Sequence, residues 1–501
     1  MNQVLSAAQW KEADTHYIGA AGINSLQLME LAALGCAEWL NAHWQEPKQV
    51  VVMAGHGNNG GDGLAIARML LEKGHQVQVY RVEASNYSTD NQTNALSLPA
   101  GVWINPDSLE DALKACAVLV DALLGFGTTR KASGTYADCI ERINQSKKPV
   151  YSIDLPSGMP ADLPFDSEWP VVKATYTLCL AGWKLNLLLP PGGALSGQVH
   201  FIPLGLETAY RAQIPLAQVY QPEEHIKLLM NRPRFAHKGN FGHALLVSGS
   251  TGMWGAAMLA AEACMRVGAG KTTVAGPDGL KAPIAGRLPE AMYLQSGEDC
   301  WELPVDTRAF SALGIGPGLG QSPKTCKALE QLLTTYHGPL VLDADALNIL
   351  AEFPELQKLL QPNTILTPHP REFDRLFGPH PDWWSRLDTA RQLSQEKSWV
   401  IVLKNAYTFT FSGNSAFPKV NTTGNPGLAK AGSGDVLTGL ITGLLAQGFS
   451  AADAAALGVY LHGLAADLAK DELPEMSLMA SDVVSAIRHA ISALSKTSTS
   501  Y

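Results

Sequence analysis

Short apolar runs alternate with longer amphipathic stretches along most of the chain. Runs rich in β-branched residues at 50–53, 77–80, 118–121 and 150–154 predict strands. Residues 64–72, between the first two of these runs, have the apolar spacing of a helix. Apolar strands that alternate with helices predict a parallel β-sheet covered by helices on both faces.

This rhythm stops at residues 205–237, which hold prolines and mixed charges, and then starts again. Further strands are expected at 244–247, 340–343, 364–367 and 400–403, with a helix at 256–267. Residues 435–490 are rich in Ala, Leu and Gly and are expected to be almost wholly helical. The pattern therefore predicts two α/β domains, one over residues 1–218 and one over residues 222–501.

Composition supports a large globular protein and narrows its partners. A chain of 501 residues is long enough for two large α/β domains. Apolar residues make up 46 % and charged residues only 17 %, which argues against a disordered chain. The net charge of -9 disfavours a general binder of nucleic acids or anionic membranes, because nothing offsets phosphate repulsion.

Cysteine usage and hydropathy indicate a cytoplasmic location. The seven cysteines are scattered and never spaced as CxxC, which favours reduced thiols over disulfides or zinc. The first residues lack the basic and apolar segments of a signal peptide. No uninterrupted apolar run approaches the ~18 residues that span a bilayer. We expect no membrane partner, and the sequence leaves a homo-oligomer open.

A first glycine-rich loop, MAGHGNNGGDG at 53–63, follows a strand and opens a helix. It contains GxGxxG at Gly55, Gly57 and Gly60, whose small size would let the backbone approach a dinucleotide pyrophosphate. The added polar residues Asn58, Asn59 and Asp62 make the motif more specific than a bare GxGxxG. The alternative is a tight turn between a strand and a helix.

Two aspartates at ends of predicted strands are expected to converge on this loop. Asp121 begins DALLGFGTTR and Asp154 begins DLPSG. Ligands bind at the carboxyl ends of parallel strands, so a shared site is favoured. The alternative is that each aspartate caps the following turn.

GHGNNGGDG, VDALLGFGTTR and SIDLPSG together resemble the NAD(P)H-hydrate epimerase domain, over roughly residues 1 to 215. The resemblance implies a Rossmann-like fold that binds a nicotinamide dinucleotide hydrated at C6 of its ring. It implies a potassium ion held by Asn59, Asp121 and Ser157, and Asp154 as the acid/base for epimerisation at C6. Substrate contacts are implied at Asn58, Asn59, Gly60, Gly61, Asp62, Gly127, Thr128, Thr129, Arg130, Lys131, Ala132, Ser133 and Asp154.

A second constellation centres on KAGSGD at 430–435, which opens a helix. Backbone amides at such a helix start can bind an anion, and Asp435 could act as a base on a hydroxyl beside a phosphoryl group. Alone, this motif could equally be a glycine-rich helix cap. Further polar or glycine-rich loops at 314–320, 343–348, 367–372 and 404–408, most of them at strand ends, favour a site. In that company His369 is interpreted as a ligand contact rather than a structural turn residue.

AHKGNFG, VSGSTGMWGAA, GIGPGLG, LDADALN, TPHPREF, LKNAYT and GNPGLAKAGSGD resemble the ADP-dependent NAD(P)H-hydrate dehydratase domain, a ribokinase-like fold, over residues 236–435. The resemblance implies that Asp435 deprotonates the C6 hydroxyl, that ADP phosphorylates it, and that phosphate leaves, with AMP as the other product. Magnesium is expected to bridge the nucleotide phosphates, with no side chain assigned to it. The implied hydrate contacts are Ala257, Gly318, His369 and Asp435, and the implied nucleotide contacts are Lys404, Asn405, Ala406, Tyr407, Thr408 and Gly434.

The sequence therefore predicts a bifunctional repair enzyme for hydrated NADH and NADPH. The first domain would interconvert the R and S hydrates, and the second would dehydrate the S form with ADP. One alternative is a small-alcohol or vitamin kinase fused to a dinucleotide-binding domain. Another is a non-catalytic nucleotide-binding or scaffold protein, which the presence of both Asp154 and Asp435 disfavours.

Overall fold

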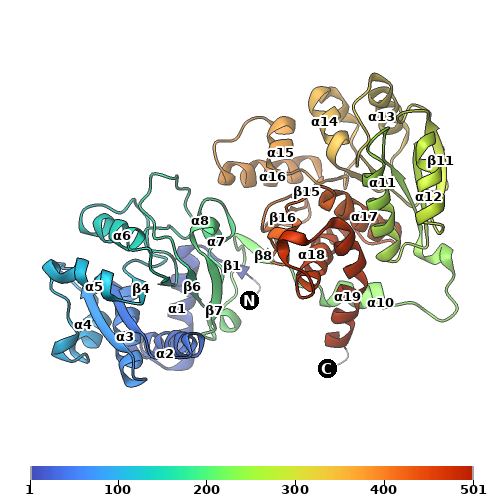
Figure 1. Cartoon of the computed structure of the whole chain (residues 1–501). Helices are drawn as coiled ribbons and strands as arrows, with labels where there is room; N and C mark the ends of the chain where they lie inside the picture. The colour runs from blue at the N-terminus through green and yellow to red at the C-terminus, as the bar shows by residue number, and fades with distance from the viewer. Residues whose placement is uncertain (1–2, 499–501) are drawn as a thin grey trace. The chain divides into compact units, whose positions relative to one another are not determined.

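The computed structural model describes residues 3–498 and divides the chain into two compact units (Figure 1). Unit 1 is Met1–Ala217 and unit 2 is Gln218–Tyr501. Each unit has its own β-sheet with helices on it, so the expected α/β class is confirmed. Within residues 3–498, no helix is long and apolar enough to cross a membrane.

Unit 1 is built on a parallel sheet with strand order β3-β2-β4-β5-β6-β7. The first four strands along the chain were predicted from their apolar runs. The last two, with less regular apolar patterns, were not. The strands are β2 (Gln49–Ala54), β3 (Gln76–Arg81), β4 (Val118–Ala122), β5 (Val150–Ile153), β6 (Tyr176–Leu180) and β7 (Gln198–Ile202).

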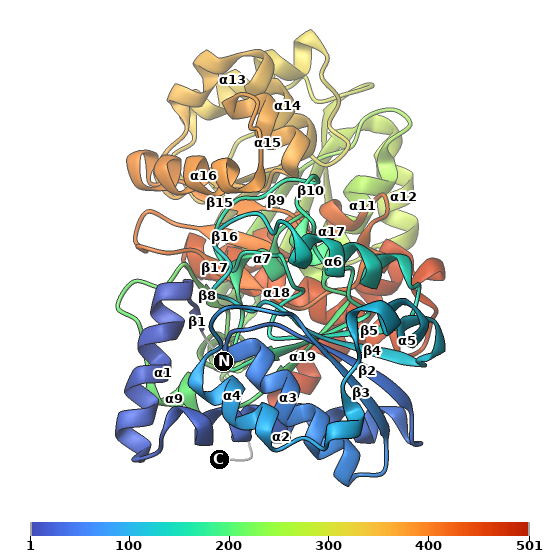
Figure 2. The same cartoon turned by 90° about the vertical axis from the view of Figure 1, so that its left-hand side faces the viewer.

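Helices cover both faces of this sheet, as its apolar strands require. Side chains alternate along β2: Val50 and Val52 pack in the core under α2 (Ser25–Trp44) and α3 (Asn58–Glu72). Val51 and Met53 enter the opposite core under α5 (Leu109–Ala115) and α6 (Thr135–Gln145). In Figure 2, α2 and α3 lie on one side of these strands and α6 on the other. The remaining elements are β1 (Gln3–Val4), α1 (Ala7–Ala21), α4 (Thr89–Leu96), α7 (Leu185–Leu188), α8 (Gly192–Leu195) and α9 (Leu206–Ala209).

The strands of unit 2 follow the order β8-β17-β16-β15-β14-β13-β12-β9-β10-β11. Neighbours from β11 to β15 are parallel, whereas β16 runs antiparallel to β15 and to β17. The strands are β8 (Ala217–Val219), β9 (His243–Val247), β10 (Lys271–Pro277), β11 (Met292–Gly297), β12 (Ala312–Ile315), β13 (Leu340–Leu342), β14 (Ile365–Leu366), β15 (Val400–Leu403), β16 (Thr408–Phe411) and β17 (Lys419–Asn421).

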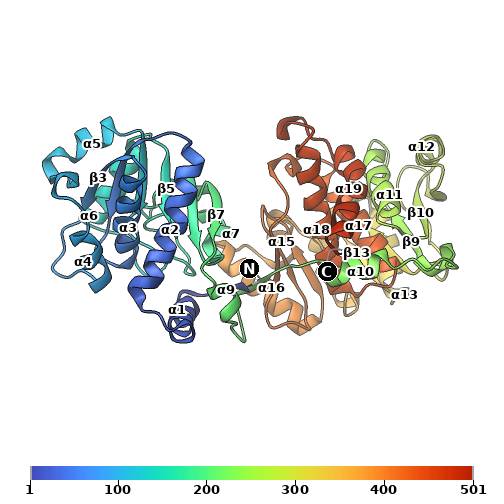
Figure 3. The same ribbon diagram turned by 90° about the horizontal axis from the view of Figure 1, so that it is seen from below.

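One face of this sheet is covered by the helical tail predicted from the sequence, together with α11 (Trp254–Arg266). The tail forms α17 (Ser433–Ala446), α18 (Ala451–Lys470) and α19 (Ala480–Ser498) (Figure 3). Gly439 lets α17 approach α11 closely, because a Cβ there would lie 2.1 Å from the Ala260 carbonyl oxygen. The other helices of unit 2 are α10 (Glu223–Met230), α12 (Lys281–Arg287), α13 (Pro323–Thr335), α14 (Ala344–Glu352), α15 (Pro370–Phe377) and α16 (Trp383–Lys397).

The segment at 205–237 contains more regular structure than its sequence pattern suggested. It holds α9, the short strand β8 and the helix α10, whose Ile226 and Leu229 are buried in the core of unit 2. These elements have only three to eight residues, which is too short for a periodic pattern to stand out.

The strand orders point to one ligand site in each unit. In open parallel sheets, ligands bind beyond the carboxyl ends of the strands where the order of connection reverses. In unit 1 this point lies between β2 and β4, in the order of flavodoxin-like sheets. In unit 2 it lies between β9 and β12.

Candidate active sites

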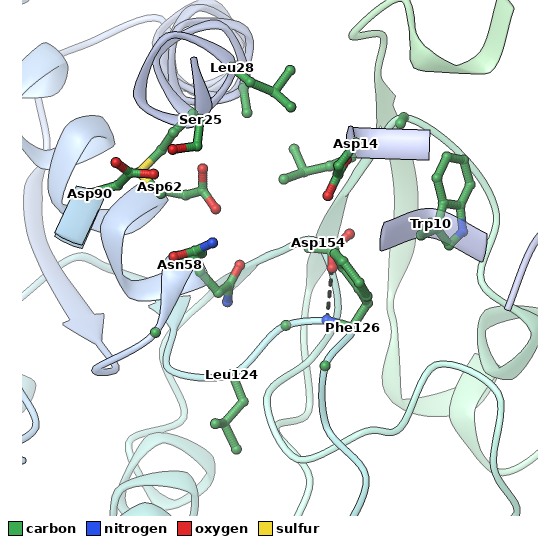
Figure 4. Close-up of a pocket in the computed structure, with 18 of the residues that line it drawn as sticks. Trp10, Asp14, Ser25, Leu28, Asn58, Asp62, Asp90, Leu124, Phe126 and Asp154 are labelled. Carbon is green, nitrogen blue, oxygen red and sulfur yellow. Dashed lines mark hydrogen bonds between the residues drawn. The ribbon is translucent and has the colours of Figure 1, made fainter. Parts of the chain in front are cut away.

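A cavity of about 560 Å³ opens at the predicted edge of the unit 1 sheet. Its wall combines α1, the start of α3 and the loops that follow β4, β5 and β6 (Figure 4). The polar residues in the wall are Asp14, Ser25, His56, Asn58, Asn59, Asp62, Asp90, Thr128, Asp154 and Lys184.

The start of α3 is arranged to receive an anion. Its N-cap, Gly57, has no side chain to cap the helix, so the first backbone amides stay available for a ligand. Gly60 is required for close packing, because a Cβ there would lie 2.0 Å from the Gly55 carbonyl oxygen. The Asn91 amide donates to the Gly55 and Gly57 carbonyls at 2.9 Å each, and Arg81 donates to the Asn91 side-chain oxygen. Arg81 therefore stabilises the loop through its hydrogen bonds to Asn91.

Asp154 lies in the cavity wall as half of a buried ion pair. Its Oδ1 lies 2.5 Å from Nζ of Lys184, and its Oδ2 accepts from the Phe126 amide at 3.0 Å. The Lys184 side chain is only 2 % exposed. Burial alone would lower the pKa of Lys184, but the charge of Asp154 outweighs it and the pKa is raised. Lys184 therefore stays charged beside the carboxyl group of Asp154.

Lys184 is a functional candidate that the sequence analysis missed. It follows β6 in a segment, AGWK, that matches no phosphate or catalytic motif. Only the position of β6 beside β5 brings it to Asp154. The feature that identifies Lys184 is the burial of a lysine near a strand end, and the sequence does not show burial.

Other carboxyl groups share the cavity with Asp154. Burial and the negative charge of Asp154 raise the pKa of Asp14 to about 6. Burial and the charges of Asp154, Asp14 and Asp90 raise the pKa of Asp62 well above its usual range. Asp62 in its neutral form can donate a hydrogen bond, which a carboxylate beside an anionic substrate could not do. Asp14 and Asp90 were not singled out from the sequence.

Asp121 and Ser157 lie together behind this wall. Asp121 is fully buried and accepts hydrogen bonds from Ser152 Oγ at 2.7 Å and from Ser157 Oγ at 2.5 Å. The Ser157 amide also donates to Asp121 at 2.9 Å. Burial raises the pKa of Asp121, although these hydrogen bonds oppose the shift. Asn59 packs against Gly125, in the loop that follows β4, so all three residues border one region.

The structure distributes the predicted substrate contacts of unit 1 unevenly. Asn58, Asn59, Asp62, Gly127, Thr128 and Asp154 line the cavity. Gly60 and Gly61 are buried in α3, where a Cβ on Gly61 would lie 2.8 Å from Met29. Thr129, Arg130, Lys131, Ala132 and Ser133 continue the loop outside the cavity wall, and all but Ala132 are exposed.

In unit 2, charged residues from three strand ends meet in a buried cluster. Asp343, which follows β13, accepts from Lys404 Nζ at 2.9 Å and from Thr438 Oγ1 at 2.7 Å. Glu372, near the start of α15, lies 3.8 Å from the same ammonium group. Burial raises the pKa of Asp343, but Lys404 and these hydrogen bonds outweigh it and the pKa is lowered. Asp343 and Lys404 are therefore both charged.

Asp435 lies beside this cluster in the first turn of α17. The N-cap of α17, Gly432, has a φ of 92° and no capping side chain, so the first amides of the helix are open to an anion. Burial and the charge of Asp343 raise the pKa of Asp435 to about 6, while Lys404 opposes the shift. A Cβ on Gly434 would lie 3.6 Å from Asp343 Oδ2 and 3.7 Å from Lys404 Nζ. The helix start therefore lies against the ion pair.

His369 caps a helix with one ring nitrogen and lies beside Glu372 with the other. It caps α15, where its Nδ1 accepts from the amides of Arg371 at 3.1 Å and Glu372 at 3.3 Å. Burial lowers its pKa, so the ring is neutral and its proton lies on Nε2. Nε2 lies 3.5 Å from Oε1 of Glu372, and the side chain is 44 % exposed, so part of the ring faces solvent. The two interpretations of His369 from the sequence are therefore compatible.

The other predicted contacts of unit 2 lie in loops and helix starts around this cluster. Asn405, Ala406 and Tyr407 form the turn between β15 and β16, and Thr408 begins β16. The side-chain nitrogen of Asn405 is buried without a hydrogen-bond partner among the described residues. Gly318 has a φ of 57°, and its carbonyl accepts from Ser250 Oγ at 2.9 Å. Ala257 is fully buried in α11.

Comparisons with known proteins assign both units. The family described as NAD(P)H-hydrate dehydratase matches residues 244–489, and the family described as YjeF-related protein N-terminus matches residues 25–186. A bifunctional NAD(P)H-hydrate repair enzyme of Coxiella burnetii is 36 % identical, over 93 % of this chain and 95 % of that protein. The chain belongs to the family of bifunctional NAD(P)H-hydrate repair enzymes.

Another bifunctional NAD(P)H-hydrate repair enzyme, from Moorella thermoacetica, is 34 % identical over 96 % of this chain and 95 % of its own length. The crystal structure of an ADP/ATP-dependent NAD(P)H-hydrate dehydratase from Bacillus subtilis, co-crystallised with ATP/Mg2+, is 33 % identical with a TM-score of 0.49. It covers 57 % of this chain and 100 % of its own. The resemblance of both halves to the NAD(P)H-hydrate repair family, inferred from the sequence motifs, is confirmed.

Proposed function

We propose that unit 1 interconverts the R and S hydrates of NADH and NADPH, and that unit 2 dehydrates the S hydrate with ADP, giving AMP and phosphate. One observation carries this proposal: each unit joins a carboxyl group to an uncapped helix start near the carboxyl ends of strands of its own sheet. Asp154 lies with the start of α3, and Asp435 lies in the first turn of α17. An assay with acid-hydrated NADH tests it. Protein and ADP together should restore the absorbance of the reduced nicotinamide ring, and no recovery would contradict the proposal.

In unit 1, the substrate phosphates would lie on Asn58 to Asp62 at the start of α3 and on the loop from Gly127 to Ser133. The amides of α3 and the exposed Arg130 and Lys131 supply positive potential there. The hydrated ring would then reach Asp154, whose ionised carboxyl group can accept a proton from the C6 hydroxyl.

We also propose that Asn59, Asp121 and Ser157 hold a potassium ion. A carboxylate, an amide and a hydroxyl offer hard oxygen ligands with a single negative charge, which suits an alkali cation better than a transition metal. The side-chain nitrogen of Asn59 is buried without a hydrogen-bond partner among the described residues, and turning the amide would present its oxygen instead. When bound, the ion would contribute positive charge behind the substrate phosphates.

Epimerisation should therefore depend on potassium. Asp121→Ala should weaken ion and substrate binding together, by about 10–100-fold, as the loss of a supporting ligand commonly does. Initial rates of R-to-S conversion against potassium concentration would measure this, with sodium at equal ionic strength as the control. Asp121→Asn is the matched variant, since it keeps the shape of the buried side chain and removes its charge. Rates independent of potassium, or a transition metal bound at these residues, would contradict the assignment.

In unit 2, Asp435 would remove the proton from the C6 hydroxyl while ADP phosphorylates the oxygen. Gly434 and the loop from Lys404 to Thr408 would bind the nucleotide, and Ala257, Gly318, His369 and Asp435 would contact the hydrate. Ala257 is fully buried, so its contact with the hydrate would require a local movement at the start of α11. Magnesium would offset the negative charge of the nucleotide phosphates, and no side chain is assigned to it. Lys404 forms an ion pair with Asp343 at this site. This pair would hold the ammonium group of Lys404 in one position when the nucleotide binds.

We propose residues 1–218 and 222–501 as the boundaries of the two activities. A fragment of residues 1–218 should epimerise without nucleotide, and a fragment of residues 222–501 should dehydrate only the S hydrate with ADP. Each would bury its own core, as domains of ~200 residues commonly do. Chromatography of the R and S hydrates over time measures both activities. If the second fragment alone quickly consumed a mixed pool, unit 1 would not be the epimerase.

The partners would be the hydrated dinucleotides and ADP, with no nucleic acid and no membrane surface. The acidic net charge of -9 supports this restriction. All seven cysteines are free thiols, which supports a cytoplasmic location.

A further inference from the structure

We propose that Asp14, on the N-terminal helix α1, is the second acid/base catalyst of the epimerase and works with Asp154 on the same substrate ring. This inference rests on the proposed epimerase function of unit 1. Asp14 lies before residue 25, where the match to the family of the N-terminal half begins.

The position of Asp14 follows from how α1 is anchored. Ser6 and Gln9 form a capping box at the start of the helix, and the Ala7 amide donates to Asp162 at 3.0 Å. Trp10 is buried, and its ring lies 5.1 Å from Nζ of Lys184. Asp14 comes four residues later and therefore lies on the same face of the helix.

Asp14 and Asp154 both belong to the wall of the 560 Å³ cavity. Figure 4 shows both carboxyl groups directed into the cavity, from α1 and from the loop after β5. No hydrogen bond or ion pair to the Asp14 carboxyl group is found among residues 3–498. Asp14 is thus a half-buried acid that faces the substrate space without a partner.

The electrostatic surroundings of the two carboxyl groups differ. Lys184 and the Phe126 amide hold Asp154 as a carboxylate. Burial and the charge of Asp154 raise the pKa of Asp14 to about 6, and Lys184 opposes this shift. The other titratable groups in the wall are Asp62, Asp90 and His56. Pairs of carboxyl groups whose environments separate their pKa values commonly divide the acid and base roles.

Epimerisation at C6 needs one group of each kind. In the hydrate, C6 carries the hydroxyl group and is bonded to the ring nitrogen. Asp154 takes the hydroxyl proton, a C=O double bond forms at C6, and the bond from C6 to the ring nitrogen breaks. The electron pair of that bond goes to the nitrogen, which receives a proton from Asp14. Rotation about the bond between C5 and C6 presents the other face of the aldehyde, and the reverse transfers close the ring with the opposite configuration.

The test is Asp14→Asn in the full-length chain. Asparagine keeps the size of the side chain but cannot exchange a proton, so kcat for conversion of R to S should fall by about 10²–10⁴, as the loss of a general acid or base typically costs. The KM should change little, because Asp14 contacts the ring rather than the phosphates. Dehydration of purified S hydrate with ADP should stay at the wild-type rate. The matched control is Glu12→Gln, on the exposed side of the same helix.

The pH profile separates a catalytic role from a structural one. In the wild type, kcat/KM for NADH hydrate should fall as pH rises through about 6, because the free enzyme loses the proton on Asp14. This limb should be absent in Asp14→Asn, after subtraction of the spontaneous reaction. A variant with near-normal kcat and an unchanged limb would overturn the role of Asp14. If the wild type itself did not interconvert the hydrates, the proposed function of unit 1 would fail instead.

Discussion

Asp435→Asn should abolish dehydration of the S hydrate and leave epimerisation unchanged. Asp435 lies at the uncapped start of α17, where burial and Asp343 raise its pKa to about 6. That pKa makes it a stronger base than an ordinary aspartate while leaving it largely ionised at neutral pH. Losing a general base typically lowers the rate by about 10²–10⁴, and we expect kcat to fall by that factor. ADP-dependent return of NADH absorbance from purified S hydrate measures it.

The same carboxyl group should set the pH dependence of dehydration. A base must be deprotonated to act, so kcat/KM of the wild type should rise with pH through about 6 and then level off. Asp471→Asn, an exposed substitution just after α18, is the matched control and should leave the rate and the profile intact. Near-normal turnover by Asp435→Asn would remove Asp435 from the mechanism.

Lys184→Met should destabilise unit 1 and impair epimerisation together. The change leaves the carboxylate of Asp154 buried without its cation, since the two side chains are 2 % and 4 % exposed. Breaking a buried ion pair from one side commonly costs about 3–5 kcal/mol. Without Lys184, the carboxyl group of Asp154 loses the ammonium group that lies beside it in the cavity wall, so epimerisation should slow. Urea denaturation would measure the loss of stability. Hydrogen exchange of residues 3–217 would show whether that loss lies in unit 1.

A second substitution distinguishes the charge from the packing. Lys184→Met combined with Asp154→Asn removes both charges and should recover most of the lost stability, but not the epimerase activity. Lys173→Met, at an exposed lysine of the same unit that lies outside the cavity wall, should change neither property. If Lys184→Met alone kept wild-type stability, Asp154 would not depend on it for its charge.

The sequence predicted the strands with continuous apolar runs and the loops between them, because both are local patterns. It placed Asp121, Asp154 and Asp435 at ends of elements, where the structure also finds them. It did not predict β6 and β7, the strands β10, β11, β12, β16 and β17 of unit 2, or the short elements between 205 and 237, most of which have irregular or brief patterns. Such elements become strands or helices through their neighbours in the fold rather than through their own sequence.

The candidate sites were less predictable than the fold, because some residues that act together with the motif residues belong to no motif themselves. Lys184 reaches Asp154 only through the pairing of β6 with β5, and Asp14 reaches the cavity from a helix that carries no motif. Motif glycines also proved to have different roles. Gly60 permits close packing of α3 against its own loop, whereas Gly127 lines the cavity.

The contact between α17 and α11 makes the position of Asp435 depend on the size of the side chains at that contact. Gly439 lies four residues after Asp435, one helical turn or about 6 Å along the axis. At Gly439 the helices are so close that even a methyl group would meet the Ala260 carbonyl oxygen. A larger residue at this contact would push the two helices apart, and the shift of α17 would move Asp435. The dehydration reaction therefore limits which substitutions α11 can accept, although Ala260 takes no part in that reaction.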